Sequence, residues 1–267
     1  MLAQTVSGGR RLTLNVIADP WFYAVAVPAV LLMGLAKSGF ASGFGALATP
    51  VLAIAVPVPQ AAAIMLPLLL VMDAVGLQQL WPHRDRALLR LLLPAGLAGT
   101  VVGTLLFGVF STRAVSAVVG GLTLLFLAQR LFFPPRADDR PASKALGRVL
   151  GVAAGFTSFV AHAGGPPVSA YLLPLRLKPL VFAATTAVFF AAVNLSKWIP
   201  YAWLGLIDLR NMSTSLVLLP LAIATNALGF WLVRVTPTEI FYRITYIIMF
   251  IISVELVREG LGELLRG

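Results

Sequence analysis

Long stretches without a charged residue restrict the environments in which this chain can fold. No Asp, Glu, Lys or Arg lies between Arg210 and Arg234, a run of 23 residues, and none lies between Lys37 and Asp73. A helix that rises about 1.5 Å per residue crosses the roughly 30 Å hydrocarbon layer of a membrane with about 20 such residues. The runs do not alternate apolar with polar residues, so they predict spanning helices and not barrel strands.

Composition agrees with a membrane protein and excludes several functions. Apolar residues make up 59% of the chain and charged residues 11%, against about 45–50% and about 25% in soluble domains. The formal net charge is +10, but the basic residues lie in short loops between apolar runs, as the positive-inside rule predicts, so we expect the lipid bilayer and no nucleic acid as partner. The absence of cysteine excludes disulfides, thiolate metal sites and a cysteine nucleophile. We expect no metal and no cofactor.

Apolar runs between charged or Pro/Gly-rich breaks predict ten helical segments. They lie near 21–36, 45–58, 61–80, 90–110, 114–133, 148–163, 165–175, 179–203, 212–233 and 240–260. The segments 45–58 and 165–175 are too short to span a membrane, and each follows a glycine-rich break, at 38–45 and 163–167. Each is therefore interpreted as half of a discontinuous or re-entrant helix pair.

The chain also repeats itself. Gly39-Phe40-x-Ser42 recurs as Gly155-Phe156-x-Ser158 at an offset of 116 residues, and Asp85 pairs with Asp208 at an offset of 123. We predict an all-α integral membrane fold with about eight crossings, as two homologous halves that each begin with a discontinuous or re-entrant pair. The predicted parts are an N-terminal cytoplasmic segment 1–20, a first repeat 21–133, a polar linker 134–147, a second repeat 148–260 and a tail 261–267.

Two topologies remain open at this stage. If each broken pair counts as one crossing, both termini, the 81–90 loop, the linker and the 204–211 loop share one side. That side then holds 13 basic residues against 5 and is predicted to be cytoplasmic. If each pair enters and leaves on the same side, each half has an odd number of crossings and the repeats are inverted.

The two breaks are the predicted substrate site. Broken helices leave unpaired backbone N–H groups at helix starts, which suit an anion, and matched breaks in two halves are typical of transporters. Lys37 adjoins the first break and is the preferred cation, with Lys197 as the weaker candidate. The alternative is that the glycines only allow close helix packing and that the lysines extend to the membrane surface. The remaining candidate binding residues are Ser38, Gly39, Ser42, Gly43, Gly45, Thr157, Ser158, His162, Gly164, Gly165 and Asn194.

Asp73 lies well inside the 61–80 segment. A carboxylate within the membrane costs about 2.5–3.5 kcal/mol on insertion scales, so it normally has a partner or a functional role. Two interpretations stay open: Asp73 carries a coupling proton or organises the site, or it forms a structural pair with a hydroxyl or a helix end.

The same residues resemble a known family. Gly34-Leu35-Ala36-Lys37-Ser38-Gly39-Phe40 through Pro50, Met72-Asp73-Ala74-Val75-Gly76, His83-Arg84-Asp85-Arg86, and Gly155-Phe156-Thr157-Ser158 with Gly164-Gly165-Pro166-Pro167 are together similar to the TauE/SafE sulfite and sulfonate exporters. The resemblance runs from about residue 25 to about residue 260. It implies a bacterial inner-membrane carrier with two similar four-helix halves that exports sulfite, sulfoacetate or related anions.

Other classes of membrane protein are the alternatives to a carrier. An anion channel or a membrane scaffold without transport activity fits the same composition. An intramembrane serine protease would use Ser38, Ser42, Ser158 or His162, but the spacing Gly39-Phe40-Ala41-Ser42-Gly43 is one residue longer than Gly-x-Ser-Gly. We therefore expect no enzyme activity.

Overall fold

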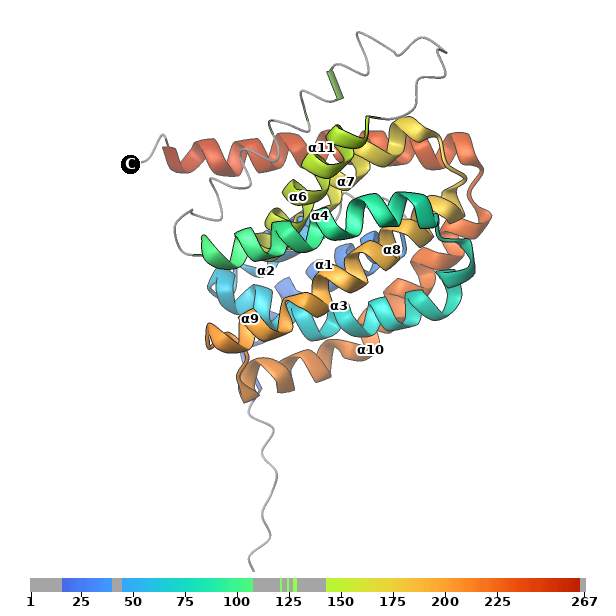
Figure 1. Ribbon diagram of the computed structural model, residues 1–267. Helices are drawn as coiled ribbons and strands as arrows, with labels where there is room; N and C mark the ends of the chain where they lie inside the picture. Colours follow the sequence, from blue (N-terminus) through green and yellow to red (C-terminus); the bar gives the residue numbers. More distant parts are fainter. Residues whose placement is uncertain are drawn as a thin grey trace, which may run out of the picture.

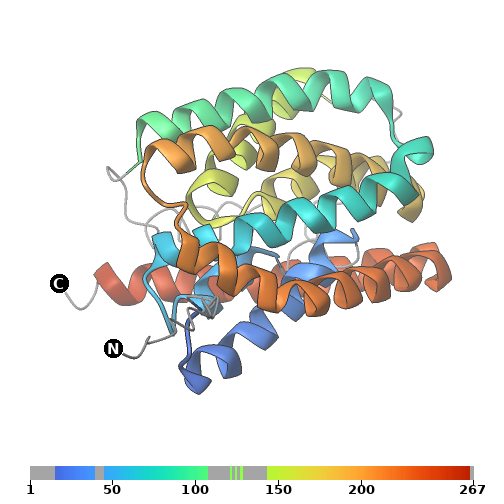
Figure 2. The ribbon, with the colours of Figure 1, turned by 90° about the horizontal axis from the view of Figure 1, so that it is seen from below.

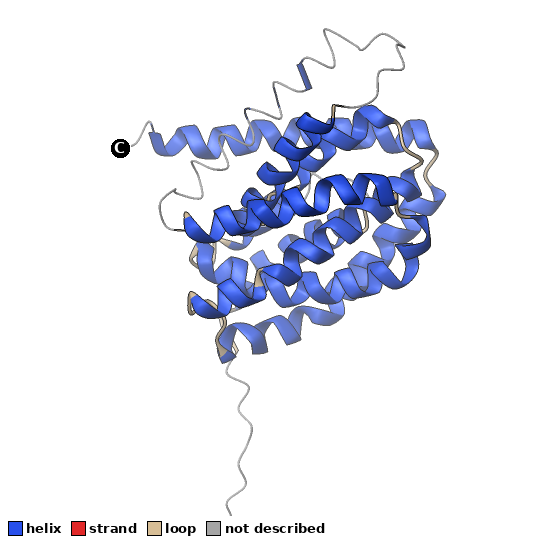
Figure 3. Cartoon of the chain, in the orientation of Figure 1, coloured by secondary structure: helices blue, strands red, loops and turns tan. Residues whose placement is uncertain are grey.

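The structure is a computed structural model that describes residues 16–39, 45–107, 121, 124, 127, 128 and 143–264. Every regular element within these residues is a helix (Figure 3). Six helical stretches are long and apolar enough to cross a membrane: Pro20–Lys37, Val58–His83, Arg86–Leu105, Lys144–Ala161, Pro179–Trp203 and Leu209–Val235. The prediction of a multi-pass helical membrane protein is confirmed. Ser42, Gly43, and most of the 114–133 segment and of the linker lie outside the described residues.

Several of these helices begin after a residue whose side chain caps the first turn. Asp85 accepts hydrogen bonds from the Ala87 and Leu88 N–H groups at the start of α4 (Arg86–Leu105), and Asp208 accepts one from the Asn211 N–H group at the start of α10 (Leu209–Val235). Ser143 caps α6 (Lys144–Ala161) in the same way, so α6 begins inside the stretch predicted as linker. Such caps satisfy backbone donors that a helix start leaves free. The repeated aspartates are thus equivalent N-caps.

Two pairs of helices form hairpins at the glycine-rich breaks. In the first, α1 (Pro20–Lys37) packs on α2 (Gly45–Leu52), with Gly45 against Ala36. In the second, α7 (Gly165–Leu172) runs back along α6, because Gly164 lies against Ser158 at the tip and Gly147 lies against Tyr171 at the open end. Both short segments therefore return toward the side from which the preceding helix came.

Two long helices run in opposite directions through the middle of the bundle (Figure 1). These are α3 (Val58–Leu80) and α8 (Pro179–Ser196), which pack on each other and are the most buried of the candidate spans. The pairing α4 with α6 has a counterpart in α1 with α10 (Figure 2), and α3 with α10 has one in α8 with α4. The short elements are η2 (Trp81–His83), η3 (Leu173–Leu175) and α9 (Trp198–Trp203), and α11 (Thr238–Leu264) ends the described chain.

The two ends of the bundle are marked by hydrogen bonds between distant segments. At one end, which we call the Gln60 end, Gln60 Nε2 donates to Asn211 Oδ1 at 3.1 Å. At the opposite end, the Asp85 end, Asp85 N donates to Thr185 Oγ1 at 3.0 Å and Arg234 donates to Gln79 at 3.2 Å. The 81–85 loop and the 204–208 loop therefore lie at opposite ends. If each broken helix pair counted as one crossing, these two loops would lie on the same side of the membrane. The structure therefore favours the topology in which each broken helix pair enters and leaves on the same side.

The offset of 116 residues does not relate equivalent positions. Gly39 follows the end of α1 with a φ of 87°, whereas Gly155 lies inside α6 against the backbone of Gly96. Helix starts instead correspond at an offset of 121 for α3 and α8 and 120 for α2 and α7. The short Gly-Phe-x-Ser match gives a wrong alignment of the two halves because the two breaks differ in length, with seven residues in the first and three in the second.

Candidate functional site

An ion pair between the first hairpin and a central helix begins the candidate site. Lys37, the last residue of α1, donates its Nζ to Asp73 Oδ1 on α3. Only 7% of the lysine side chain and 4% of the aspartate side chain are exposed. The ring of Phe190 lies 5.5 Å from Lys37 Nζ, within the range of a cation–π contact. Lys37 therefore does not extend to the membrane surface, and Asp73 has a charged partner.

Asn194 connects this pair to a second lysine. Its Nδ2 donates to Asp73 Oδ2 at 2.7 Å and its Oδ1 accepts from Lys197 Nζ at 2.9 Å. A carboxylate can only accept and an ammonium can only donate, so the two neighbours fix the orientation of the amide. Asp73 and Asn194 are each the sixteenth residue of their helices. The bond between them therefore joins matching positions of α3 and α8.

Lys197 lies at the end of α8 and is fully buried. Its Nζ donates to the backbone oxygen of Ser158 at 2.6 Å and to Ser158 Oγ at 2.8 Å, and it lies 3.1 Å from His162 Nδ1. Ser158 and His162 belong to the tip of the second hairpin. The tips of both hairpins therefore meet α3 and α8 in one hydrogen-bonded network of six residues, Lys37, Asp73, Asn194, Lys197, Ser158 and His162.

The network contains more positive than negative charge. If both lysines are protonated, Lys37 and Lys197 carry two positive charges, and Asp73 is the only buried carboxylate among the residues that the structure describes. With a neutral His162, the group carries a net charge of about +1. Asp73 balances Lys37, whereas Lys197 has oxygen and nitrogen acceptors but no carboxylate within bonding distance in the described chain. A buried charge normally requires a counter-charge.

The other predicted residues surround the network or support the hairpins. Ser38 Oγ donates to Leu35 O at 2.7 Å, and Gly39 lies against Ala183. Thr157 Oγ1 donates to Ala163 O at 3.1 Å and so ties the break to the end of α6. Gly164 caps α7 and Gly165 is its first residue, as Gly45 is the first residue of α2.

The second break offers fewer free backbone N–H groups than the sequence predicts. The second and third residues of α7 are Pro166 and Pro167, and proline has no N–H group. The Val168 N–H group donates to Gly164 O at 3.4 Å. The start of α7 therefore offers little for an anion, and the side chains of the network are the stronger candidates.

Some residues of the site were not singled out from the sequence. Phe190 faces Lys37 and the backbone oxygen of Ala62 faces His162, and no local signal predicts either contact because both depend on packing between helices. Outside the network, Thr49 and Ser169 are buried hydroxyl residues, each the fifth residue of its short half-helix. Their matching positions are a signal that alignment of the helix starts would have found.

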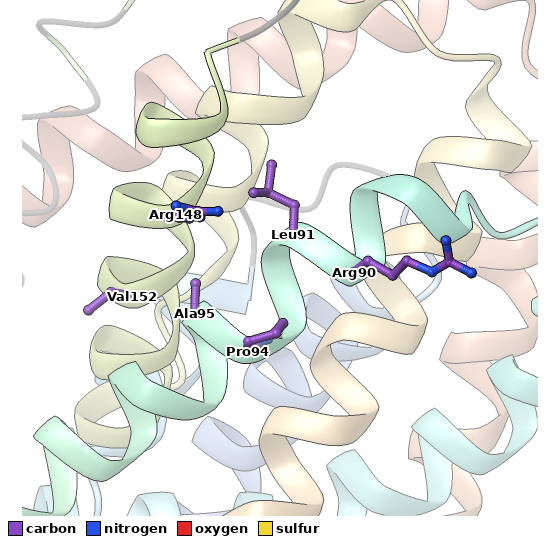
Figure 4. A pocket seen from close by; sticks show the side chains of 6 residues that line it. All are labelled: Arg90, Leu91, Pro94, Ala95, Arg148 and Val152. Carbon is purple, nitrogen blue, oxygen red and sulfur yellow. The ribbon is translucent and has the colours of Figure 1, made fainter.

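A separate cavity of about 340 Å³ opens between α4 and α6 (Figure 4). Its polar lining residues are Arg90 and Arg148, and its floor is formed by Leu91, Pro94, Ala95 and Val152. The two arginine side chains extend in different directions and do not form one clamp (Figure 4). None of these residues belongs to the buried network.

A multi-pass helical bundle with buried lysines and a buried carboxylate belongs to the class of membrane transporters, because charged groups at this depth mark the path of a solute or an ion. The model of the sulfite exporter TauE/SafE family matches residues 26–256, and the chain belongs to that family. The resemblance inferred from the sequence is thereby confirmed. No curated protein and no solved structure is significantly similar to the chain.

Proposed function

We propose that the protein exports small sulfur-containing anions, such as sulfite or organosulfonates of the sulfoacetate type, across a bacterial inner membrane. The observation that carries this proposal is that the buried network holds two lysines, Lys37 and Lys197, but only one carboxylate, Asp73. A small anion supplies the missing counter-charge, and the hydrogen-bonding groups around Lys197 replace the water that the anion loses on entry. Membership of the sulfite exporter family supports the same class of substrate.

Lys197 is the main anion-binding cation in this proposal, ahead of Lys37. The charge of Lys37 is balanced by Asp73, whereas Lys197 has no carboxylate among its partners. Asp73 then keeps Lys37 and Asn194 in place, which is the site-organising role considered from the sequence. Proton transfer at Asp73 stays a prediction. Each of its oxygens accepts one hydrogen bond, and each keeps a second lone pair that can take a proton.

We propose alternating access between two halves that are arranged as inverted repeats. Helices α3 and α8 run in opposite directions with Asp73 and Asn194 at matching positions, and the hairpins enter from opposite ends of the bundle. Repeats of this kind let one half rock against the other around a site near the midplane. At about 1.5 Å per residue, Asp73 and Asn194 lie about 22 Å along their helices, which places the network inside the membrane from either end.

The Asp85 end of the bundle faces the cytoplasm in this proposal. Nine of the basic residues that the structure describes lie at that end, against Arg210 and Arg258 at the Gln60 end. The positive-inside rule then places residues 16–19 outside the cytoplasm, which differs from the expectation for the N-terminal segment. The nine are Arg84, Arg86, Arg90, Lys144, Arg148, Arg176, Lys178, Arg234 and Arg243.

The chain suits a direct test of this orientation because it has no cysteine. His83→Cys places a single thiol at an exposed position of the Asp85 end, and Leu204→Cys places a single thiol at an exposed position of the Gln60 end. A membrane-impermeant maleimide should label Leu204→Cys in intact cells and His83→Cys only after permeabilisation. The reverse pattern would contradict the orientation, and equal labelling of both in intact cells would contradict the opposite placement of the two loops.

Transport itself is tested with purified protein in proteoliposomes. Uptake and counterflow of sulfite, sulfate, thiosulfate, sulfoacetate and acetate should be saturable for at least one sulfur anion and weaker for acetate. Lys197→Met should weaken binding of that anion by about 1.5–3 kcal/mol, the value of a charged hydrogen bond, and Lys197→Arg should keep part of it. Lys178→Met, which changes an exposed lysine, is the matched control and should transport like the parent.

These measurements also distinguish the alternative classes. Flux that does not saturate and shows no counterflow indicates a channel, and no flux of any solute indicates a scaffold. The contact between Ser158 Oγ and Lys197 resembles a serine–lysine pair, but this lysine donates to Ser158 and is not free to act as a base. Labelling by a fluorophosphonate probe that is lost in Ser158→Ala would nevertheless favour a hydrolase and contradict the transporter proposal.

A further inference from the structure

His162 occupies an unusual backbone position at the tip of the second hairpin. Its φ is 53°, and it is one of two non-glycine residues with a positive φ among those that the structure describes. The corresponding left-handed position at the first tip is Gly39, which lies against Ala183 of α8, as His162 lies against Ala62 of α3. A side chain in this conformation has a steric cost that glycine avoids. The position of an imidazole here therefore points to a role for the ring.

The contacts of the ring determine which nitrogen carries hydrogen. His162 Nε2 lies 3.1 Å from the backbone oxygen of Ala62, which can only accept, so Nε2 is the N–H donor. In a neutral imidazole Nδ1 then has a free electron pair. That electron pair faces Lys197 Nζ at 3.1 Å.

Lys197 has more acceptors than it has hydrogens. An ammonium has three N–H groups, and the Ser158 backbone oxygen, Ser158 Oγ and Asn194 Oδ1 accept from Nζ at 2.6, 2.8 and 2.9 Å. His162 Nδ1 is the fourth acceptor and the most distant. It is therefore the group most easily released when Lys197 gains another partner.

We propose that His162 Nδ1 is a proton-binding site whose occupancy is linked to anion binding at Lys197. A proton on Nδ1 would place an N–H group against an ammonium 3.1 Å away, so the ring stays neutral while Lys197 holds its present position. An anion that draws Lys197 toward itself, or that lies between the two cations, removes this repulsion. Nδ1 then takes up a proton from the bulk solution, and the anion and the proton bind together. By reciprocity, protonation of His162 strengthens anion binding by the same factor.

The other charged and titratable groups near the ring do not replace Lys197 in this role. Lys37 on α1 adds a more distant positive charge of the same sign, and Asp73 on α3 is reached through Asn194 and is paired with Lys37. Tyr201 on α9 lies 6.4 Å from the ring between centroids and donates its hydroxyl to Phe159 O. Helix α2 has no titratable residue, and α11 contributes Ile248 and Ile252 to the adjacent apolar cluster.

The sequence allows the ring to be observed directly. His83 and His162 are the only histidines of the chain, so His83→Gln gives a protein in which all histidine signals belong to His162. Nitrogen-15 magnetic resonance of this protein in bilayers distinguishes the Nε2–H tautomer, the Nδ1–H tautomer and the imidazolium. Without anion, between about pH 6 and 8, the expected spectrum is that of the neutral Nε2–H form. An Nδ1–H tautomer, or an imidazolium at about pH 6 without anion, would overturn the proposal.

Two further measurements test the linkage between the proton on His162 and the anion at Lys197. In Lys197→Met, combined with His83→Gln, the fraction of imidazolium at about pH 6 should exceed that of the parent because the repulsive charge is gone, although burial still disfavours a charged ring, whereas Lys178→Met should leave the spectrum unchanged. Sulfoacetate, added to the protein with Lys197 intact, should convert the ring to the imidazolium as it binds. The second measurement does not depend on the folding of the lysine variant. Sulfoacetate that binds saturably without changing the ring would overturn the linkage.

Proton uptake gives an independent measure, which rests on the proposed anion transport. Addition of sulfoacetate to weakly buffered proteoliposomes should cause uptake of up to one proton for each bound anion in the parent and in His83→Asn. In His162→Asn this uptake should be lost while saturable binding remains with reduced affinity, since asparagine tolerates the left-handed conformation but does not titrate. Uptake equal to that of the parent in His162→Asn would place the proton elsewhere, with Asp73 as the next candidate. If no anion binds at all, the proposed function fails, and the tautomer and Lys197→Met spectra still decide whether the two cations exclude each other.

Discussion

Removal of both members of the Lys37–Asp73 pair should cost clearly less folding free energy than the sum of the two single removals. Both side chains are more than nine-tenths buried, and breaking a buried ion pair costs about 3–5 kcal/mol because one charge is left without a partner. In Lys37→Met, Asn194 still donates to Asp73 Oδ2, and a hydrogen bond to a charged group is worth about 1.5–3 kcal/mol. The expected loss of folding free energy is therefore near the lower end, about 3 kcal/mol.

The double variant Lys37→Met/Asp73→Asn buries no unpaired charge at these two positions. It should be less destabilised than the sum of the single variants, with a coupling energy of about 2–3 kcal/mol. The assay is reversible unfolding in mixed micelles, with the four proteins of the cycle measured under one condition. Folded protein is required in each case, because a loss of transport alone does not distinguish a lost site from a lost fold.

An exposed ion pair in the same chain is the matched control. Arg176 and Glu239 lie 4.0 Å apart with 77% and 84% of their side chains exposed, and exposed pairs contribute about 0–1 kcal/mol. The cycle of Arg176→Met and Glu239→Gln should therefore show a coupling energy close to zero. A coupling energy below about 0.5 kcal/mol in the Lys37–Asp73 cycle would refute the interpretation of this pair as a buried unit.

Two further substitutions test the packing around the site. Tyr201→Phe removes the hydroxyl that donates to the buried oxygen of Phe159 at 2.7 Å, so thermal unfolding of the detergent-solubilised protein should show a loss of about 1–3 kcal/mol; an unchanged unfolding temperature would mean that this bond is not formed. Gly155→Ala would place its Cβ 1.9 Å from the Gly96 backbone oxygen and should separate α4 from α6 with a large drop in stability, whereas Gly121→Ala has open space and should be tolerated. Equal stability of the two alanine variants would contradict the close approach of α4 and α6.

The helices and their breaks could be predicted from the sequence because both are local features. Uncharged runs determine where a helix can cross, and glycine-rich stretches determine where one ends, as after Lys37 and before Gly165. Whether a short half-helix continues across the membrane or returns is not local. It is decided by contacts between distant residues, such as that between Gly147 and Tyr171. The length of the apolar run does not distinguish a half-helix that continues from one that returns.

The residues of the site were also identifiable one by one, but their partners were not. Lys37, Asp73 and Lys197 are each conspicuous as charges near or within apolar runs. Lys37 and Asp73 are 36 residues apart, and Lys197 and Ser158 are 39 apart, so the pairing depends on how the hairpins pack against α3 and α8. The sequence therefore favoured Lys37 as the anion-binding cation. The structure balances Lys37 with Asp73 and leaves Lys197 without a carboxylate among its partners.

An exchange of the two bridging side chains tests which lysine holds the anion. Asp73 and Asn194 contact each other from matching positions of α3 and α8, so Asp73→Asn/Asn194→Asp moves the carboxylate toward Lys197, whose Nζ lies 2.9 Å from Asn194 Oδ1. The net charge and the side-chain volumes are nearly unchanged, so the protein should fold. Lys197 would then be neutralised and Lys37 would become the cation without a counter-charge. If Lys197 binds the anion, affinity for sulfoacetate should fall about tenfold or more, the effect of about 1.4 kcal/mol or more, in protein whose unfolding matches the parent. An affinity equal to that of the parent would mean that the anion recognises the summed charge of the network, and that neither lysine is a specific binding residue.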